Sequence, residues 1–449
     1  MKKVLIIGGG LAGLSAGVAL AEAGYKVHLL ERRAFLGGRA YSFIDQTSGE
    51  VIDNGQHLMM GCYQETFKFF AKLKTLDRLQ FQKQSRVDFL DEQNGQTTLL
   101  CPSWPAPLHL LAGLFRLKGI SFADKIRALL IGSALQTKNG KLESKFGNLT
   151  VDQWLDSCNQ SSLMKERFWY PFAIATLNED PKVAPATLLI KVLQQAFAGT
   201  KEDSTMVTAK VGLSELYTEQ AKNFIESHSG QVTLRANVTS LGITGDKCQG
   251  IVLKDNTILN ADVYISAVPY FALQEFLPTN LLKENSYFKK MQSLTSAPIV
   301  SVYLWFDKSI TDLGFAGMLG THLQWMFNKD ILFSRSKTEE QLLTFVISAA
   351  HKYAKLTKEK LVEIAIADVR RLLPKASNAK VVRSLVVKEH HATFSASVLT
   401  EANRPNAVTP INNLFLAGDW TNTGLPATIE GAVLSGHRCA EHIIGSSNN

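Results

Sequence analysis

Paired cysteines are absent from this chain, which has only five cysteines in 449 residues. Cys62, Cys101, Cys158, Cys248 and Cys439 are widely spaced, odd in number and without a CxxC pair. Secreted proteins held by disulfides pair their cysteines, whereas thiols stay free in the reducing cytoplasm. The sequence therefore predicts a reduced cytoplasmic protein with mostly buried thiols and no disulfide. No set of residues has zinc-ligand spacing, so no metal site is expected.

Long apolar runs are also lacking. No stretch of about 18 or more uncharged apolar residues, as a membrane-spanning helix requires, follows the N-terminal segment. Residues 1–24 imitate a signal peptide, but their glycines have a functional spacing and a second strand pattern follows at once. We expect an unprocessed cytoplasmic protein, either free or in peripheral contact with the inner face of the membrane.

Charge is not concentrated in any one segment. Lys and Arg number 48 against 40 Asp and Glu, a formal charge of +8. This balance could favour nucleic acid, an anionic membrane or a phosphorylated ligand. The basic residues are scattered, so a nucleic-acid partner is not expected. The length indicates two or three domains with ordinary folded composition.

The N-terminal segment has the pattern of a dinucleotide-binding unit. A buried strand over residues 3–7, a helix over 14–23 and a second strand over 25–30 are predicted in that order. A GxGxxG turn joins the first strand to the helix; its glycines permit the turn, the approach of a pyrophosphate and close helix–strand packing. The helix N-terminus favours the phosphate charge. The residues of this turn predicted to bind the cofactor are Gly8, Gly10, Ala12 and Gly13.

Charged residues and two glycines follow the second strand. Glu31 stands where an acidic side chain accepts ribose hydroxyls, and Arg32 is next. A domain for NAD alone would continue to its next crossover helix. Here Gly37, Gly38 and Arg39 form a GG-R arrangement that resembles the amine oxidase and phytoene desaturase superfamily of FAD enzymes. The resemblance implies that the loop wraps the cofactor with Arg39 near its phosphates; the alternative is a glycine turn with a solvated arginine.

The C-terminal part carries the matching half of the pattern. A strand over residues 414–417, Gly418-Asp419, a loop and a helix from about Thr428 follow one another. In the superfamily this arrangement closes the FAD site, which implies that Asp419 bonds the ribityl or phosphate region. The helix N-terminus would face the flavin N1–O2 edge, where reduced flavin is negative. Val238 lies in a segment where the superfamily holds the adenine through backbone groups. FAD is therefore the predicted cofactor.

Cofactor motifs at both ends predict an interleaved chain. The expected fold class is α/β, a Rossmann-like FAD-binding domain with an interleaved α+β substrate domain. The FAD-binding domain is predicted to comprise residues 1–85, 205–290 and 385–449. The substrate domain is predicted to comprise residues 86–204 and 291–384.

Residues 101–135 are Pro-punctuated and then apolar, with basic residues at intervals. These are Arg116, Lys118, Lys125 and Arg127. Such a segment can lie in a membrane interface or line a lipid entrance. It can equally form two ordinary amphipathic helices. The sequence leaves both interpretations open.

Further segments carry a narrower resemblance. They are DNGQHLMMGCYQET, FWYPFAIATLNEDP, SAPIVSVYLWFD, QWMFN and LPATIEGAVLSG. Together they resemble the squalene-associated FAD-dependent desaturases, a family that includes hydroxysqualene dehydroxylase of bacterial squalene and hopanoid biosynthesis. The resemblance runs from about residue 3 to 442 and implies a C30 isoprenoid substrate. It also implies reductive dehydroxylation of hydroxysqualene to squalene, with hydride from reduced FAD quenching an allylic cation. Only one dinucleotide fingerprint is present, so a reductant or electron donor must visit transiently.

The polar cluster DNGQH lies beside the flavin in the superfamily. This implies that Gly55 lets the backbone approach the ring and that Asp53 and Asn54 brace the turn or contact the cofactor. His57 is a candidate general acid, because its ordinary pKa is near neutrality. Asp53 and His57 are therefore the predicted catalytic residues. The alternative is that both only hold the loop through hydrogen bonds.

Three other functions fit parts of the pattern. A carotenoid-type desaturase uses a similarly long substrate and runs the oxidation instead, and no motif fixes the direction of electron flow. An amine oxidase is a weaker alternative, because the middle segments match the isoprenoid group better. A flavin-bearing scaffold without chemistry is disfavoured by intact cofactor motifs at both ends.

Overall fold

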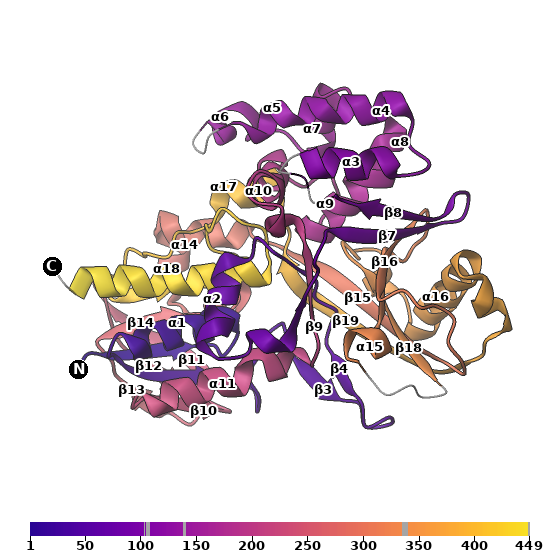
Figure 1. Ribbon diagram of the computed structural model, residues 1–449. Coiled ribbons are helices and arrows are strands. Elements are labelled where there is room, and N and C mark those ends of the chain that lie inside the picture. Colours follow the sequence, from indigo (N-terminus) through magenta and orange to yellow (C-terminus); the bar gives the residue numbers. More distant parts are fainter. Residues whose placement is uncertain (103, 105–107, 138–140, 335–339, 448–449) are drawn as a thin grey trace.

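Two large sheets of different construction organise the chain in the computed structural model (Figure 1). The structure describes residues 1–449 except 103, 105–107, 138–140, 335–339 and 448–449. A parallel sheet with its helices contains both chain termini, and an antiparallel sheet lies beside it. A lobe of helices stands above the antiparallel sheet (Figure 1). The predicted α/β class is confirmed.

The parallel sheet has the strand order β10-β2-β1-β14-β20, and every neighbouring pair is parallel. Its central strands are short runs of Val, Ile and Leu buried on both faces, as parallel strands under two helical layers require. The five strands are β1 (Lys3–Ile7), β2 (Lys26–Glu31), β10 (Gln231–Leu234), β14 (Val263–Ser266) and β20 (Leu414–Leu416). The first two and the last match the predicted strands within one residue.

Three helices pack against this sheet, and the first of them contacts the other two. They are α1 (Leu11–Glu22), α11 (Leu213–Ser227) and α18 (Ile429–Ser447). Helix α18 runs alongside α1 (Figure 1), and Gly436 makes the approach possible. A Cβ at Gly436 would lie 2.1 Å from Ser15 Oγ and 2.3 Å from the Ala12 carbonyl oxygen. The first and last helices of the chain thus pack closely at Gly436, where there is no room for a side chain.

The second sheet has the order β19-β15-β18-β17-β16-β7-β8 and is antiparallel except between β16 and β7. Its strands are β7 (Arg86–Asp91), β8 (Gly95–Leu100), β15 (Ser296–Phe306), β16 (Phe315–Leu319), β17 (Trp325–Asn328), β18 (Gln341–Ile347) and β19 (Val381–Phe394). Helix α16 (Lys358–Leu372) packs against β15 and β19 and shares one apolar core with β18. Strand β19 crosses the boundary expected between residues 384 and 385. The division into domains stays a prediction.

The helical lobe stands above the antiparallel sheet in Figure 1. It comprises α3 (Leu108–Arg116), α4 (Phe122–Arg127), η2 (Ala128–Ile131), α5 (Gly132–Leu135), α6 (Leu142–Phe146), α7 (Val151–Ser157), α8 (Ser162–Met164), the π-helical η3 (Lys165–Trp169), α9 (Tyr170–Leu177) and α10 (Ala186–Phe197). Fully buried Trp154 and Leu188 belong to its core.

Smaller elements join these parts. The strands are β3 (Ser42–Ile44) with β4 (Val51–Asp53), β5 (Met59–Met60) and β6 (Leu79–Phe81) with β9 (Met206–Ala209), and β11 (Val238–Thr244) with β12 (Lys247–Leu253) and β13 (Ile258–Leu259). The helices used below are α2 (Gln64–Lys72), α15 (Lys329–Leu332) and α17 (Val398–Asn403). Strand β4 leads directly into the polar DNGQH cluster.

Candidate active site

The first glycine turn has the shape that a dinucleotide needs. Gly8 has a φ of +110°, a conformation that side chains other than glycine rarely adopt. A Cβ at Gly13 would lie 2.0 Å from the Gly8 carbonyl oxygen, so helix α1 packs on the turn only through glycine. Both residues were predicted from their spacing, and the structure gives each the expected geometric role.

The N-terminus of α1 is free to receive an anion. Gly10 precedes helix α1 and provides no side-chain acceptor, and the first turn of α1 contains no acidic residue. Leu11 and Ala12 are nevertheless buried. Amide groups at a buried helix start need an acceptor, and a phosphate satisfies both the amides and the helix dipole. This helix start therefore fits a pyrophosphate.

Glu31 is buried at the end of β2 and braces the turn. Its Oε2 accepts from the Gly9 amide at 2.8 Å and its Oε1 from the Arg33 amide at 2.8 Å. The Ala236 amide donates to the Glu31 carbonyl, so the chain that leads to Val238 and β11 passes over this strand end. A carboxylate has further lone pairs, and binding of ribose by Glu31 stays a prediction. Arg32 next to it is exposed.

The GG-R loop folds back onto the first glycine turn. The Gly37 amide donates to the Gly9 carbonyl at 2.9 Å. Gly38 has a φ of +59°, and a Cβ there would lie 3.0 Å from the Gly10 Cα. The two predicted glycine motifs are thus in contact, with room for backbone only.

Arg39 joins the N-terminal motif to the C-terminal one. Its Nη2 pairs with Asp419 Oδ1, and its Nη1 donates to the Ala392 carbonyl at 3.3 Å. Asp419 is buried, whereas the Arg39 side chain is about one-third exposed. The structure therefore brings together two predicted cofactor residues that are 380 positions apart in the sequence.

The C-terminal motif is fixed by short polar contacts. Gly418 has a φ of +147°, and its amide donates to Ser435 Oγ at 2.8 Å. Thr428 Oγ1 accepts from the Gly431 amide at 3.0 Å and so caps the start of α18. The helix begins where the sequence predicted. Contact of Thr428 and this helix start with the flavin stays a prediction.

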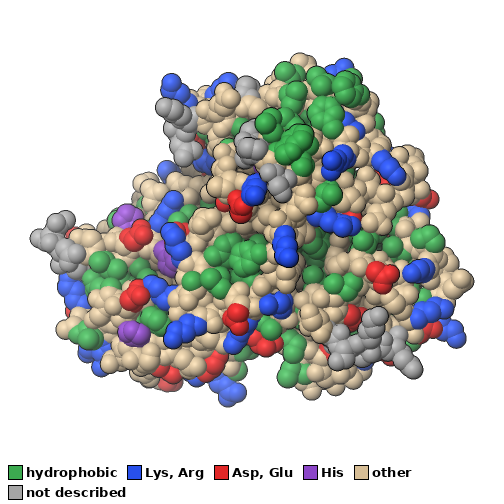
Figure 2. All heavy atoms as spheres, in the orientation of Figure 1, with side chains coloured by type: hydrophobic (Ala, Val, Ile, Leu, Met, Phe, Trp, Pro, Cys, Tyr) green, Lys and Arg blue, Asp and Glu red, His purple; other side chains and the backbone are tan. Residues whose placement is uncertain are grey.

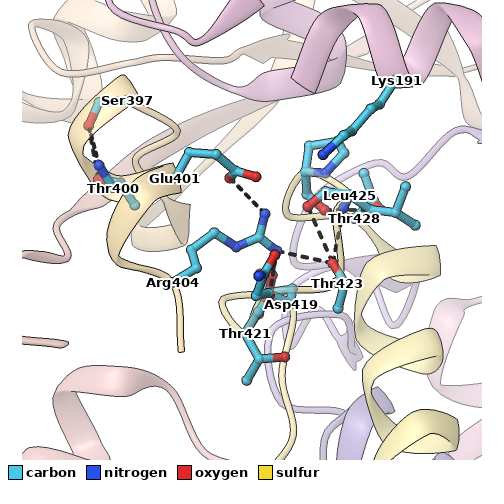
Figure 3. Close-up of polar contacts among 12 residues, drawn as sticks. Lys191, Ser397, Thr400, Glu401, Arg404, Asp419, Thr421, Thr423, Leu425 and Thr428 are labelled. Carbon is cyan, nitrogen blue, oxygen red and sulfur yellow. Dashed lines mark hydrogen bonds and ion pairs between the residues drawn. The ribbon is translucent and has the colours of Figure 1, made fainter. Parts of the chain in front are cut away.

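Arg404 holds the loop that carries Asp419, and sequence reasoning missed it. Its side chain is fully buried, with Nη2 donating to the carbonyls of Asp419 (2.9 Å) and Thr421 and to Thr423 Oγ1 (3.0 Å). Its Nη1 pairs with Glu401 of α17 at 2.8 Å. Figure 3 shows the guanidinium between Glu401 and the turn of this loop. No motif surrounds Arg404 in the sequence that could have indicated this role.

Asp53 and Asn54 are held firmly by the protein. The Asp53 carboxylate accepts from Ser42 Oγ, the Leu213 amide and Lys329 Nζ, at 2.8, 3.0 and 2.6 Å. Asn54 donates to the Arg39 carbonyl at 3.0 Å and accepts from the Tyr41 amide. These contacts fit the bracing role that was weighed for both residues. A catalytic role for Asp53 stays a prediction.

His57 differs from Asp53 in its surroundings. Its imidazole is half-buried and makes no hydrogen bond to any other residue that the structure describes. Burial lowers the pKa of His57; the Asp53 charge raises it and the Lys329 charge lowers it further. The adjacent Gln56 has a buried Oε1 without a partner in the described part of the chain. Gly55, before them, has its Cβ position open except for Ser301 Oγ at 3.8 Å.

An apolar cluster begins one residue after His57. Leu58 packs against Phe327, Leu332 and Val346 together with partly exposed aromatic side chains. Two of these aromatics, Phe315 and Trp325, also pack against the larger core cluster, which includes Phe89 of β7 and the buried residues of the helical lobe. The polar segment thus meets an apolar face at the junction of sheet and lobe.

The residues present fit the predicted FAD. The uncapped start of α1 suits a pyrophosphate, and the touching glycine turns leave their backbones accessible to it. Arg39 supplies a partly exposed cation beside them. No cluster of three or more His, Cys, Asp or Glu side chains suited to a metal occurs among the residues that the structure describes.

Comparison with known proteins agrees with this geometry. A model of the flavin containing amine oxidoreductases matches residues 11–444. The 15-cis-phytoene desaturase of Synechococcus elongatus is 26% identical over 98% of this chain and 96% of its own. The hydroxysqualene dehydroxylase of Zymomonas mobilis is 27% identical over 98% and 99%. The resemblance stated from the sequence motifs is thus confirmed.

Solved structures show the same fold. An oxidoreductase from Methanosarcina mazei aligns with a TM-score of 0.76 at 18% identity, covering 98% of this chain and 100% of the other. A putrescine oxidase with bound putrescine aligns with a TM-score of 0.75 at 15% identity, covering 99% of each. At these identities the likeness concerns the fold alone. The family match over nearly the whole chain is the decisive finding: this chain belongs to the flavin-containing amine oxidoreductases, and FAD is its cofactor.

Proposed function

We propose that the protein is a dehydroxylase that converts hydroxysqualene to squalene. The observation that carries this proposal is that the His57 imidazole makes no hydrogen bond to any other described residue, while Leu58, the next residue, packs in the apolar cluster. A C30 isoprenoid alcohol has one hydroxyl on a long apolar chain and needs such a combination. Similarity to the hydroxysqualene dehydroxylase of Z. mobilis supports the same substrate.

The residues have distinct tasks in this proposal. The amides at the start of α1 and Arg39 would bind the pyrophosphate, and Asp419 would bind the ribityl region. The apolar cluster would hold the isoprenoid and exclude water. When bound, reduced FAD supplies the hydride that replaces the departing hydroxyl. A reductant or electron donor that visits transiently would restore the reduced cofactor.

His57 would donate a hydrogen bond or a proton to the leaving hydroxyl. Burial lowers the pKa of His57 and so favours its neutral form over the imidazolium. An acid-catalysed departure of water would therefore become slower as the pH rises through this lowered pKa. Asn54 and Asp53 would keep the segment in place.

A desaturase of carotenoid type is the second candidate. The similarity to 15-cis-phytoene desaturase of S. elongatus has nearly the same identity and coverage as that to the dehydroxylase. A hydrocarbon substrate would use the same apolar face but would have no hydroxyl for His57. The two candidates therefore differ in the direction of electron flow and in their need for this imidazole.

An anaerobic single-turnover experiment separates them. The FAD-loaded protein is reduced in D2O, so that the exchangeable hydrogen on the reduced flavin is deuterium, then mixed with hydroxysqualene and followed by flavin absorbance and mass spectrometry. We expect squalene with one deuterium to form in step with flavin reoxidation. Reduced protein that stays unchanged, while oxidised protein is reduced by phytoene, would establish the desaturase instead.

His57→Gln tests the role of the imidazole in the same assay. Glutamine keeps a hydrogen-bond donor, but its amide cannot act as a general acid. We expect turnover at least about 100-fold slower and without its fall at higher pH, since general acids contribute about 10²–10⁴-fold. The matched control is His228→Gln, because His228 is exposed and follows the last residue of α11. Equal turnover in both variants would show that His57 has no part in catalysis.

We further propose that the helical lobe contacts a membrane surface. Phe122, Leu108 and Leu130 are 71%, 53% and 48% exposed, and exposed Arg116 and Lys118 lie in the same segment. Figure 2 shows hydrophobic side chains gathered on this lobe with Lys and Arg among them. An apolar patch with basic residues suits an anionic lipid interface. None of the described helices is long and apolar enough to cross a bilayer.

Sedimentation with lipid vesicles tests this contact. We expect binding to vesicles that contain phosphatidylglycerol, and a loss of binding in a Phe122→Ser, Leu130→Ser double variant. Ile258→Ser is the control, because Ile258 is 65% exposed on β13, away from the lobe. Equal binding of both variants would contradict the proposed surface.

A further inference from the structure

A fully buried ion pair stands behind the DNGQH segment. Lys329 Nζ and Asp53 Oδ2 are 2.6 Å apart, and their side chains are 1% and 2% exposed. Lys329 begins α15 at the end of β17, whereas Asp53 ends β4. Charges this deeply buried are strongly unfavourable unless paired. The pair therefore ties the antiparallel sheet to the segment that continues to His57.

Asp53 is fixed by further groups from separate parts of the chain. Its other carboxylate oxygen accepts from Ser42 Oγ and from the Leu213 amide at the start of α11, where the helix dipole favours an anion. Tyr303 of β15 donates its hydroxyl to the Asp53 carbonyl at 2.6 Å. The end of β4 is thus held on several sides.

The next residue extends these contacts to the cofactor motifs. Asn54 bonds the backbone of Arg39 and Tyr41, and Arg39 pairs with Asp419. The polar contacts of the adjacent residues Asp53 and Asn54 therefore link Lys329 to the two motifs that fit FAD. Sequence reasoning singled out Asp53 but gave no role to Lys329.

We infer that Lys329 is a positioning residue that holds the Asp53–His57 segment beside the flavin and keeps that segment electrically neutral through its pair with Asp53. This inference rests on the proposed place of the segment next to the flavin ring. Lys329 also lies over the Phe333 ring, 4.1 Å from its centre, which fixes the direction of its side chain. The role needs the charge as well as the shape of the side chain.

Removing either charge has opposite electrostatic consequences. Lys329→Met leaves a buried carboxylate without its cation, and Asp53→Asn leaves a buried ammonium without its anion. Reduction of a flavin adds negative charge to it, so a nearby uncompensated anion disfavours reduction and an uncompensated cation favours it. A role that is merely structural would move both variants in the same direction.

A redox titration of the FAD-loaded protein tests the inference. We expect the flavin reduction potential to fall in Lys329→Met, to rise in Asp53→Asn and to return toward the original value in the double variant. Lys165→Met is the matched control, because Lys165 pairs with Asp152 and Asp156 within the helical lobe. Where Lys329→Met does not fold, Lys329→Arg replaces it, and the potential should stay near the original value because the charge is kept. Shifts of equal sign, or none, would overturn the inference.

If the reduction potentials do not shift as expected, titration of His57 by nuclear magnetic resonance shows whether the charge pair or the place of the segment beside the flavin is at fault. Asp53 and Lys329 are the charged groups that act on His57, with opposite effects on its pKa. The pKa of His57 should rise in Lys329→Met and fall in Asp53→Asn, with or without substrate. If His57 responds in this way while the potential does not, the segment does not lie beside the flavin. That result would be independent of whether the enzyme dehydroxylates or desaturates.

Discussion

Replacing Arg404 by methionine removes the group that holds the Asp419 loop while keeping much of its apolar volume. The guanidinium is fully buried and donates to two carbonyl oxygens and one hydroxyl, besides its pair with Glu401 (Figure 3). A hydrogen bond contributes about 1 kcal/mol net, and a buried acceptor left without a donor costs about 1–3 kcal/mol. The Glu401 carboxylate would also lose its cation. The expected loss of stability is therefore about 3–5 kcal/mol, as for other buried ion pairs deprived of one partner.

The same change should weaken cofactor binding, because Asp419 loses the contact that fixes its backbone. We expect FAD to dissociate at least about tenfold more readily, which corresponds to about 1.4 kcal/mol. Thermal unfolding with and without added FAD measures the stability, and flavin fluorescence measures the affinity. Arg86→Met is the matched control, because its side chain is 52% exposed and its pair with Asp88 should contribute about 1 kcal/mol or less. An Arg404→Met variant with the stability and FAD affinity of the original would refute this reasoning.

Three further predictions concern packing, thiol reactivity and acid stability. Gly436→Ala should destabilise the protein by about 1–3 kcal/mol in chemical unfolding because its Cβ would overlap α1, whereas Gly445→Ala on the same helix has nothing within 4 Å and should be neutral or stabilising. Burial raises the pKa of the Cys439 thiol, so iodoacetamide at pH 8 should leave it unmodified until the protein unfolds, and rapid labelling of the folded protein detected by mass spectrometry would contradict this. The hydrogen bond from Lys165 lowers the pKa of Asp152 below its ordinary 3.8. The stability that the Asp152 carboxylate contributes is therefore complete above pH 3.8 and is lost as the pH falls through the pKa of the folded state. Asp152→Asn should remove this part of the acid dependence of unfolding, and an unchanged acid transition would show that the pair contributes nothing.

The parts of the fold that sequence reasoning found are those with a local cause. The strand over 3–7 and the turn at Gly8 follow from a short apolar run and from a conformation that glycine permits. The helix begins at Leu11, before the predicted Leu14, because the apolar pattern does not show where hydrogen bonding starts. The strand over 414–417 and the helix after Thr428 were found for the same local reasons.

The contacts that complete the site have no local cause. Arg404 and Lys329 are single basic residues without a motif, and their partners come from other segments of the chain. A cation gains its role here only when folding buries it beside particular oxygens. The apolar run over 101–135 likewise left membrane contact and ordinary packing undecided, since exposure depends on what the lobe covers.

In the DNGQH segment, residue type alone does not tell a catalytic side chain from one that positions the chain. Asp53 and His57 are both titratable and only four positions apart, and both were predicted to be catalytic. Asp53 lies at the end of a strand, where a helix start and a buried lysine meet its carboxylate, so its bonding capacity is directed to the protein. His57 directly precedes Leu58 of the apolar cluster, and its imidazole makes no hydrogen bond to any other residue that the structure describes. The distinction arises from the neighbours that tertiary structure supplies, which is why His57 is the stronger candidate for chemistry and Asp53 for positioning.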